Sequence, residues 1–321
     1  DLLRRSERKR VDTAGFCKQA RVLIVAGKGG VGKTTVAATL AQMAADAGLR
    51  ALVVEIEGKS GLGAAFGSSD ALDYEERELA PNIRARTVTP DFALIEYLED
   101  HGLRRVGKRL AKSGALEVVS SAIPGIKDIL VLGKVKALAR EDPADVIIVD
   151  APAAGHAITF LASARGLLDA VRVGPIVDQA RDVNDMLTDA GKCQVILVTL
   201  PEETPVNEVV ETAFALEDRV GIKLAPLVVN GVYPVLDLDM GAIAREGVDG
   251  SDAENLRAAA EFRLHRQALQ AEQITRLRDA LPLPQLVLPQ LFTSALGPAE
   301  LHALATAMAD QVAHLPAVGA A

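Results

Sequence analysis

One short segment restricts what this chain can fold into more than any other. Residues 22–40 read VLIVAGKGGVGKTTVAATL, an apolar run that turns into a glycine-rich loop and then into a helix-forming stretch. Within it, Gly27 to Thr34 fit the pattern G-x-x-x-x-G-K-[ST], in which consecutive backbone N–H groups converge on a polyphosphate. The pattern requires a strand before it and a helix after it, and the flanking residues favour both. The segment therefore predicts a phosphate-binding loop.

Further apolar runs recur along the chain at the intervals that a layered α/β fold requires. Several are continuous rows of Val, Ile and Leu, which is typical of parallel strands buried on both faces. Helix-forming stretches fill the gaps, so strand alternates with helix. We therefore expect an α/β, doubly wound, mostly parallel sheet of the P-loop NTPase type. The expected strands are 22–26, 51–56, 145–150, 194–200 and 224–230, and the expected helices are 33–47, 204–220, 253–281 and 298–312.

The alternation is interrupted in places, and these interruptions suggest how the chain is divided. Residues 91–142 form a long, mainly helical block, which we interpret as a helical insertion subdomain. Its apolar face would line either a groove for a client or the seam that packs the insertion onto the sheet. Residues 1–20 begin with a basic run and are expected to form a basic N-terminal tail. The ATPase core would then comprise residues 21–90 and 143–321.

The composition argues against several kinds of partner. The net charge of −8 argues against general binding to nucleic acid or to an anionic membrane surface. No apolar run reaches about 18 residues, so we expect no direct insertion into a membrane. The two cysteines, Cys17 and Cys193, are far apart in the sequence and form no C-x-x-C metal pair. A reduced, cytoplasmic setting fits them best.

Each residue type in the phosphate loop has an expected role toward ATP or ADP. The glycines allow the backbone to approach the phosphates, and the following helix directs its positive dipole end toward them. Lys33 should contact the β- and γ-phosphates, and the Thr34 hydroxyl should be a ligand of Mg²⁺. The predicted nucleotide-binding residues of this segment are Gly29, Gly30, Val31, Gly32, Lys33, Thr34 and Thr35.

A second lysine, Lys28, has no role in the ordinary motif. The sequence KGGVGKTT resembles the deviant Walker A loop of the signature-lysine ATPases, which include MinD-like regulators, nitrogenase iron protein and the arsenite-pump/guided-entry (ArsA-like) ATPases. The resemblance implies that Lys28 reaches across a dimer interface to the partner's nucleotide, as an arginine finger does. The alternative is a lysine that only faces solvent.

Residues 145–161, DVIIVDAPAAGHAITFL, resemble the switch II segment of the ArsA-like branch, approximately D-T-A-P-T-G-H-x-x-x-F-L. The alanine–proline order is shifted by one position. The resemblance implies that Asp150 has a catalytic role, holding Mg²⁺ through water together with Thr34. It also implies that Gly155 offers a backbone N–H to the γ-phosphate, so the segment responds when that phosphate is lost.

Three further positions are assigned by weaker resemblances. Residues 54–66, VEIEGKSGLGAAF, occupy the place of the branch's switch I pattern, D-P-A-H-S-L-S-D-A-F. The spacing back from Phe66 puts Glu57 where the family has its water-orienting aspartate, which is a departure from the family. Asn230 in LVVNGVYP resembles the adenine-contacting asparagine. Pro289 leads a segment that resembles the loop closing over the base.

Together the resemblances imply a Mg²⁺-dependent ATPase that opens and closes as a dimer and presents a helical surface to an unidentified protein client. The chain has one phosphate loop, so the second copy must come from another chain, either identical or a paralogous ATPase. We expect no zinc, because the C-x-x-C clasp of the guided-entry factors is missing. Glu57 keeps an alternative open, a weakly hydrolysing regulatory or scaffold subunit paired with a paralogous ATPase. The isolated chain is expected to hydrolyse ATP slowly.

Overall fold

The computed structural model describes residues 11–56, 61–102, 125–236, 251–293 and 295–315. Its centre is a sheet in which the described strands follow the order β3-β4-β2-β5-β1-β6-β7-β8. Neighbouring strands are parallel except β3 and β4. This confirms the expected α/β, doubly wound sheet. The strands are β1 (Val22–Gly27), β2 (Ala51–Ile56), β3 (Arg77–Ala80), β4 (Ile83–Val88), β5 (Val146–Ala153), β6 (Cys193–Thr199), β7 (Leu227–Val232) and β8 (Gln285–Pro289).

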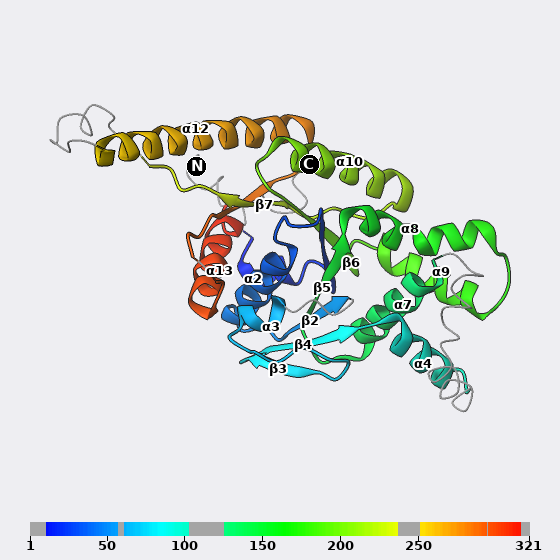
Figure 1. The fold of residues 1–321 in the computed structure, drawn as a ribbon. Helices are drawn as coiled ribbons and strands as arrows, with labels where there is room; N and C mark the ends of the chain where they lie inside the picture. Colours follow the sequence, from blue (N-terminus) through cyan, green and yellow to red (C-terminus); the bar gives the residue numbers. More distant parts are fainter. Residues whose placement is uncertain (1–10, 57–60, 103–124, 237–250, 294, 316–321) are drawn as a thin grey trace, which may run out of the picture.

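Helices cover both faces of this sheet (Figure 1). One face is covered by α1, α2, α3 and α13, and the other by α7, α8, α9 and α10, with part of α12. The described helices are α1 (Thr13–Cys17), α2 (Lys33–Asp46), α3 (Gly61–Ala65), α4 (Pro90–Asp100), α7 (Ile126–Glu141), α8 (Ala154–Ala170), α9 (Pro175–Thr188), α10 (Glu203–Val220), α12 (Ser251–Ala280) and α13 (Pro298–Val312).

The two faces of β1 explain why its sequence is apolar without interruption. Val22 and Ile24 belong to the cluster under α7 to α10, whereas Leu23 and Val25 belong to the cluster under α2 and α13. Since successive side chains of a strand point to opposite faces, a strand covered on both sides needs an apolar residue at every position. All six residues of β1 are buried.

The segment expected to be a basic tail is packed in its second half. Residues 13–17 form α1, and Phe16 and Cys17 in it are each only 1% exposed. Burial raises the pKa of the Cys17 thiol to about 12 and raises the pKa of Cys193 as well, because a thiolate is poorly solvated among apolar side chains. Residues 1–10 lie outside the described part.

The apolar face expected in the helical insertion is largely an internal seam. Ile129, Leu132 and Val135 of α7 are fully buried in the cluster that packs α7 against the sheet and its neighbouring helices. In this structure these residues are therefore core, not an open groove. The boundaries of the insertion at residues 91 and 142 stay a prediction, and residues 103–124 lie outside the described part.

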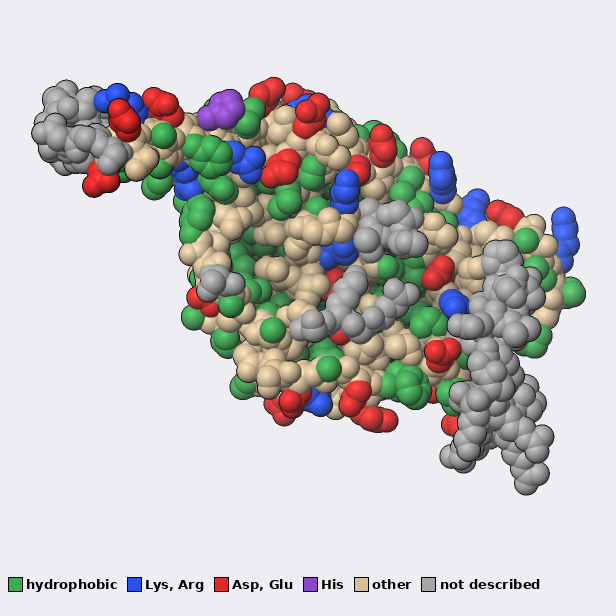
Figure 2. All heavy atoms as spheres, in the orientation of Figure 1, with side chains coloured by type: hydrophobic (Ala, Val, Ile, Leu, Met, Phe, Trp, Pro, Cys, Tyr) green, Lys and Arg blue, Asp and Glu red, His purple; other side chains and the backbone are tan. Residues whose placement is uncertain are grey.

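Charged side chains of both signs are mixed over the surface. On the face in Figure 2, acidic and basic groups alternate along the edges of the molecule, including the exposed side of α12. Among the residues that the structure describes, no helix is both long and apolar enough to cross a membrane.

Candidate nucleotide-binding site

The predicted phosphate loop connects β1 to α2 at the carboxyl end of the central strand, and two of its glycines are required by geometry. A Cβ on Gly27 would lie 2.3 Å from the carbonyl oxygen of Val198 in β6. Gly32 has a φ of +91°, and a Cβ there would lie 2.2 Å from the side-chain nitrogen of Asn230. Side chains at these positions would push the loop off the sheet, so the glycines fix where the loop sits.

Lys33, the first residue of α2, brings a cation into this loop. Its Nζ donates a hydrogen bond to the carbonyl oxygen of Lys28, 2.9 Å away, and the residue is 7% exposed. The N-cap of α2 is Gly32, which has no side chain to accept from the first-turn N–H groups. A buried lysine beside uncapped N–H groups at the positive end of a helix is an arrangement suited to a phosphate anion.

Thr34 and Asp150 meet beside the loop. The Thr34 hydroxyl donates to Oδ2 of Asp150 at 2.6 Å. Asp150 is fully buried in β5 and lies opposite Val25 of β1. A hydroxyl and a carboxylate oxygen are the hard ligands that Mg²⁺ prefers. The donor set therefore fits the predicted magnesium site, either by direct contact or through water.

A second buried carboxylate, which the sequence reasoning did not select, lies on the neighbouring strand. Glu55 of β2 is paired in register with Asp150, is 1% exposed and accepts a hydrogen bond from the Thr87 hydroxyl at 3.2 Å. The signal was present in the sequence, because both carboxylates follow a row of apolar residues. Glu57, the residue that we selected from this segment, lies outside the described residues.

Lys28 points away from its own loop. Its Nζ lies 2.5 Å from Oε1 of Glu208, a residue of α10 that is 180 positions away in the sequence. Both side chains are partly exposed, at 43% and 36%. Lys28 and Lys33 therefore leave the same loop in different directions and have different partners.

The remaining predicted contacts lie around the same end of the sheet. The Asn230 side chain donates to the carbonyl oxygen of Val31 at 2.9 Å, so it supports the loop itself. Pro289 ends β8 and lies opposite Val232 of β7. Gly155 lies in the first turn of α8, which directly follows β5. Contacts of Asn230 and Pro289 with adenine, and of Gly155 with a phosphate, stay predictions.

Gly29, Gly30 and Thr35, the other predicted nucleotide-binding residues, have no contact among the described residues that points to a ligand. Gly29 and Gly30 are exposed, and Gly30 has a φ of +85° with open space where a Cβ would be. The carbonyl oxygen of Thr35 accepts from the Thr39 hydroxyl at 2.8 Å, an ordinary bond within α2. Backbone donation by these residues to a nucleotide stays a prediction.

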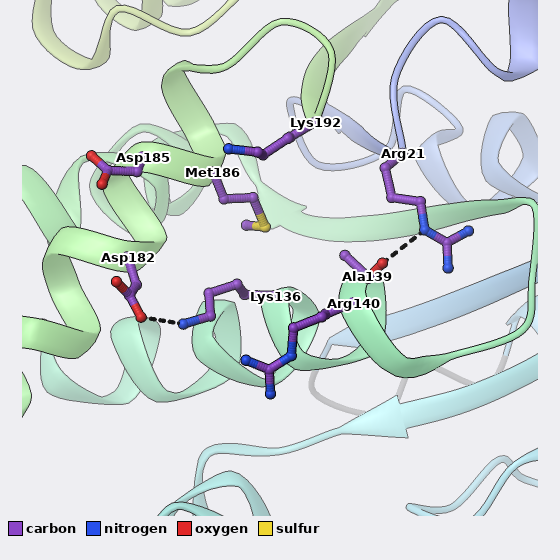
Figure 3. Close-up of a pocket in the computed structure, with 8 residues that line it drawn as sticks. All are labelled: Arg21, Lys136, Ala139, Arg140, Asp182, Asp185, Met186 and Lys192. Carbon is purple, nitrogen blue, oxygen red and sulfur yellow. Dashed lines mark hydrogen bonds and ion pairs between the residues drawn. The ribbon is translucent and has the colours of Figure 1, made fainter.

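A separate hollow of about 460 Å³ lies near α7 and α9 (Figure 3). Arg21 and Lys192 line it, and they directly precede β1 and β6, so it is at the end of the sheet opposite the phosphate loop. Its cations already have partners, which leaves little attraction for an anion. Arg21 donates to carbonyl oxygens at the end of α7. The three other cations form ion pairs: Lys136 with Asp182, Arg140 with Glu141 and Lys192 with Asp189.

Comparison with known proteins adds to this geometry. Residues 20–174, which contain the phosphate loop and Asp150, match the family model described as anion-transporting ATPase. A Mycobacterium tuberculosis protein named ATPase BagA is 30% identical, and the alignment covers 91% of this chain and 93% of that protein. This chain belongs to the ArsA-like, anion-transporting ATPase family. As a member of that family it is an ATPase.

Other ArsA-like ATPases are similar over smaller regions. The arsenical pump-driving ATPase of Escherichia coli is 26% identical over 69% of this chain, which spans 41% of that protein. ATPase get3 of Schizosaccharomyces pombe is 27% identical over 49% of this chain and 50% of its own length. The aligned part of this chain therefore corresponds to less than half of the Escherichia coli pump-driving ATPase.

Proposed function

We propose that this ATPase is a Mg²⁺-dependent dimeric switch, in which Lys28 acts on the nucleotide of the partner subunit. The observation that carries the proposal is the different placement of the two lysines. Lys33 is turned into its own loop, where it can serve the phosphates bound there. Lys28 is turned outward toward α10 and is partly exposed. A cation in that position is available to a second subunit, where it would neutralise the charge that develops during phosphoryl transfer.

The proposed magnesium site rests on Thr34 and Asp150. Both residues offer oxygen ligands, and they are already within hydrogen-bonding distance of each other. A Mg²⁺ ion held by these two residues would act as a Lewis acid and offset the negative charge of the phosphates. Asp150 would hold the ion from a buried position in β5, and Thr34 would hold it from the start of α2.

The proposed client surface belongs to the helical segment 91–142. Because the apolar residues of α7 face the core, client contact must use other residues of this segment. Phe92 of α4 is one such residue, since it is 50% exposed and its ring stacks on that of Tyr74 with the ring centroids 4.8 Å apart. We propose that nucleotide-driven closure presents or hides this surface. The client is a protein that has not been identified.

The identity of the second subunit depends on Glu57. A carboxylate longer by one methylene cannot hold the attacking water where an aspartate would, and a misplacement near 1 Å costs on the order of 10²-fold in rate. A homodimer would have this defect at both sites, whereas a paralogous ATPase with the ordinary aspartate would supply one fast site. Slow turnover by the isolated chain, increased in Glu57→Asp, would favour the paralogue. A stable homodimer with fast turnover, unchanged by Glu57→Asp, would exclude it.

The proposed division of roles between the lysines is tested by direct titration with ATP. Lys33→Ala should remove tight binding, because it deletes the cation on the phosphates. Lys28→Ala should keep binding but lose ATP-dependent association and turnover. Lys192→Ala, at the opposite end of the sheet, is the matched control and should behave as the unmodified protein. Equal loss of binding in both loop variants would show that Lys28 serves its own nucleotide.

A further inference from the structure

The contact between Lys28 and Glu208 joins the phosphate loop to a helix that has no other assigned role in the reaction. Nζ of Lys28 lies 2.5 Å from Oε1 of Glu208. The second carboxylate oxygen, Oε2, is buried and has no hydrogen-bond donor among the described residues. Lys28 is thus the partner that the structure gives this carboxylate.

Other cations close to α10 have partners of their own. Arg266 of α12 lies 3.0 Å from the carboxylate of Glu202, just before α10. Arg276 donates to the side-chain oxygen of Asn207, the residue before Glu208. Neither arginine is shown bound to Glu208, so removal of Lys28 would leave a partly buried carboxylate without its cation.

We propose that Glu208 is a positioning residue that holds Lys28 within its own subunit and thereby sets the threshold for ATP-dependent closure. This inference rests on the proposed function, in which Lys28 moves to the partner's nucleotide. To do so, the ammonium group must exchange the carboxylate of Glu208 for phosphate oxygens. The free energy needed to break the contact between Lys28 and Glu208 therefore makes closure less favourable by the same amount.

The exposure of the pair determines how large the effect is. A buried pair would trap Lys28, because breaking it would leave an uncompensated charge in an apolar environment. A partly exposed pair raises the equilibrium constant for the paired arrangement by a factor of roughly two to five, and salt reduces this factor. A contact of this strength biases the open state without preventing closure once ATP provides a more strongly charged partner.

The first experiment measures the contact in the isolated chain, which needs no dimer. Lys28 is acylated by an amine-reactive reagent, and its rate of modification is followed by mass spectrometry. We expect Glu208→Gln to raise this rate about two- to five-fold at low salt, because the ammonium group loses its partner. Glu211→Gln, an exposed glutamate one turn along α10, is the control and should leave the rate unchanged. Equal rates in all three proteins would overturn the proposal.

The second experiment measures the consequence for closure. With a non-hydrolysable ATP analogue, Glu208→Gln should lower the apparent dissociation constant of the dimer about two- to five-fold, with the affinity for the analogue unchanged. High salt should reduce this difference. In the Lys28→Ala background, which is expected to lose ATP-dependent association, Glu208→Gln should not restore it. If Glu208 had only a structural role, Glu208→Gln would not produce a change in the dissociation constant of the dimer that depends both on salt and on Lys28.

The outcomes separate the two proposals. If the unmodified protein does not dimerise in the presence of the analogue, the proposed switch is wrong as a homodimer, whatever the labelling shows. If it associates, but Glu208→Gln behaves like Glu211→Gln or keeps its effect without Lys28, the switch stands and the positioning role of Glu208 is wrong. Unfolding midpoints in urea verify that the variants are folded.

Discussion

Thr34 and Asp150 are joined by a 2.6 Å hydrogen bond between the first turn of α2 and strand β5. These residues are 116 positions apart in the sequence, and the pairing of β1 with β5 brings them together. The contact links the phosphate loop to the segment that resembles switch II. We propose that a change in what occupies the loop reaches the start of α8 through this carboxylate.

Asp150→Asn should make the affinity for ATP independent of Mg²⁺. The amide is isosteric and can still accept from the Thr34 hydroxyl, so the fold should be kept, but it lacks the charge that holds the cation. We expect Mg²⁺-dependent turnover to fall roughly 10- to 100-fold. ATP titrations with and without Mg²⁺ should then give similar affinities. An affinity that is still strengthened by Mg²⁺ as in the unmodified protein would remove Asp150 from the metal site.

Gly32→Ala should destabilise the protein more than Gly30→Ala, although both glycines have a positive φ. The left-handed conformation costs an alanine about 1–2 kcal/mol at either position. Only at Gly32 does the added Cβ overlap the Asn230 side chain, at 2.2 Å, which should add about 1–3 kcal/mol. Urea unfolding of the two variants measures the difference. Asn230→Ala should reduce that excess when it is combined with Gly32→Ala, and an unchanged excess would place the strain elsewhere.

The buried thiols predict how stability depends on pH. Burial raises the pKa of Cys17 from 9.0 to about 12, so in alkaline solution the unfolded chain loses this proton before the folded chain does. The stabilising contribution is complete below about pH 9 and is lost as pH rises toward 12. For Cys17 and Cys193 together, we expect the free energy of unfolding to fall by about 1–2 kcal/mol between pH 8 and 9.5.

Urea unfolding at a series of pH values measures this fall in the free energy of unfolding. Cys17→Ala should roughly halve the slope of the free energy of unfolding against pH. The cavity that this substitution creates lowers the free energy of unfolding equally at every pH, so it does not change the slope. A free energy of unfolding that is constant between pH 8 and 9.5 would contradict the assigned burial of the thiols.

Purified protein should contain no stoichiometric zinc, and arsenite or antimonite should not stimulate hydrolysis. Cys17 and Cys193 are both buried, and the chain has no C-x-x-C pair, so neither a tetrahedral thiolate site nor a cysteine cluster for a metalloid can form. Elemental analysis and phosphate release with and without arsenite measure these two properties. Zinc bound at one atom per dimer would overturn this prediction.

The sequence predicted the central sheet well because burial on both faces leaves a continuous apolar row that few other structures produce. It did not predict the edges. In β3 (RELA) no position is fully buried, and in β4 (IRARTV) arginines interrupt the apolar residues although five of its six positions are buried. Strand β8 is short and ends in proline. Edge strands, and a strand such as β4 that contains arginines, have weaker apolar patterns, so they are less visible in a single sequence.

The site was predictable where its residues are close together in the sequence. The loop from Gly27 to Thr34 carries its own pattern, and Asp150 was selected because residues 145–161 resemble switch II. The strand that we expected to end at Asp150 continues to Ala153. The contact between Lys28 and Glu208 depends on where α10 packs, which no local spacing encodes. The structure adds a contact that the sequence did not predict, in which the Asn230 side chain donates to the carbonyl oxygen of Val31; its contact with adenine stays a prediction.

The central claim, that Lys28 acts in trans, is tested most directly by mixing two inactive variants. Lys28→Ala keeps its own nucleotide site but lacks the lysine for its partner, and Lys33→Ala has the opposite defect. In a mixed dimer, one site has both groups, so equal amounts of the two chains should recover about a quarter of the turnover of the unmodified protein. Recovered phosphate release in the mixture, absent from each variant alone, is the predicted result. No recovery, although mass measurements show that mixed dimers form, would contradict the account.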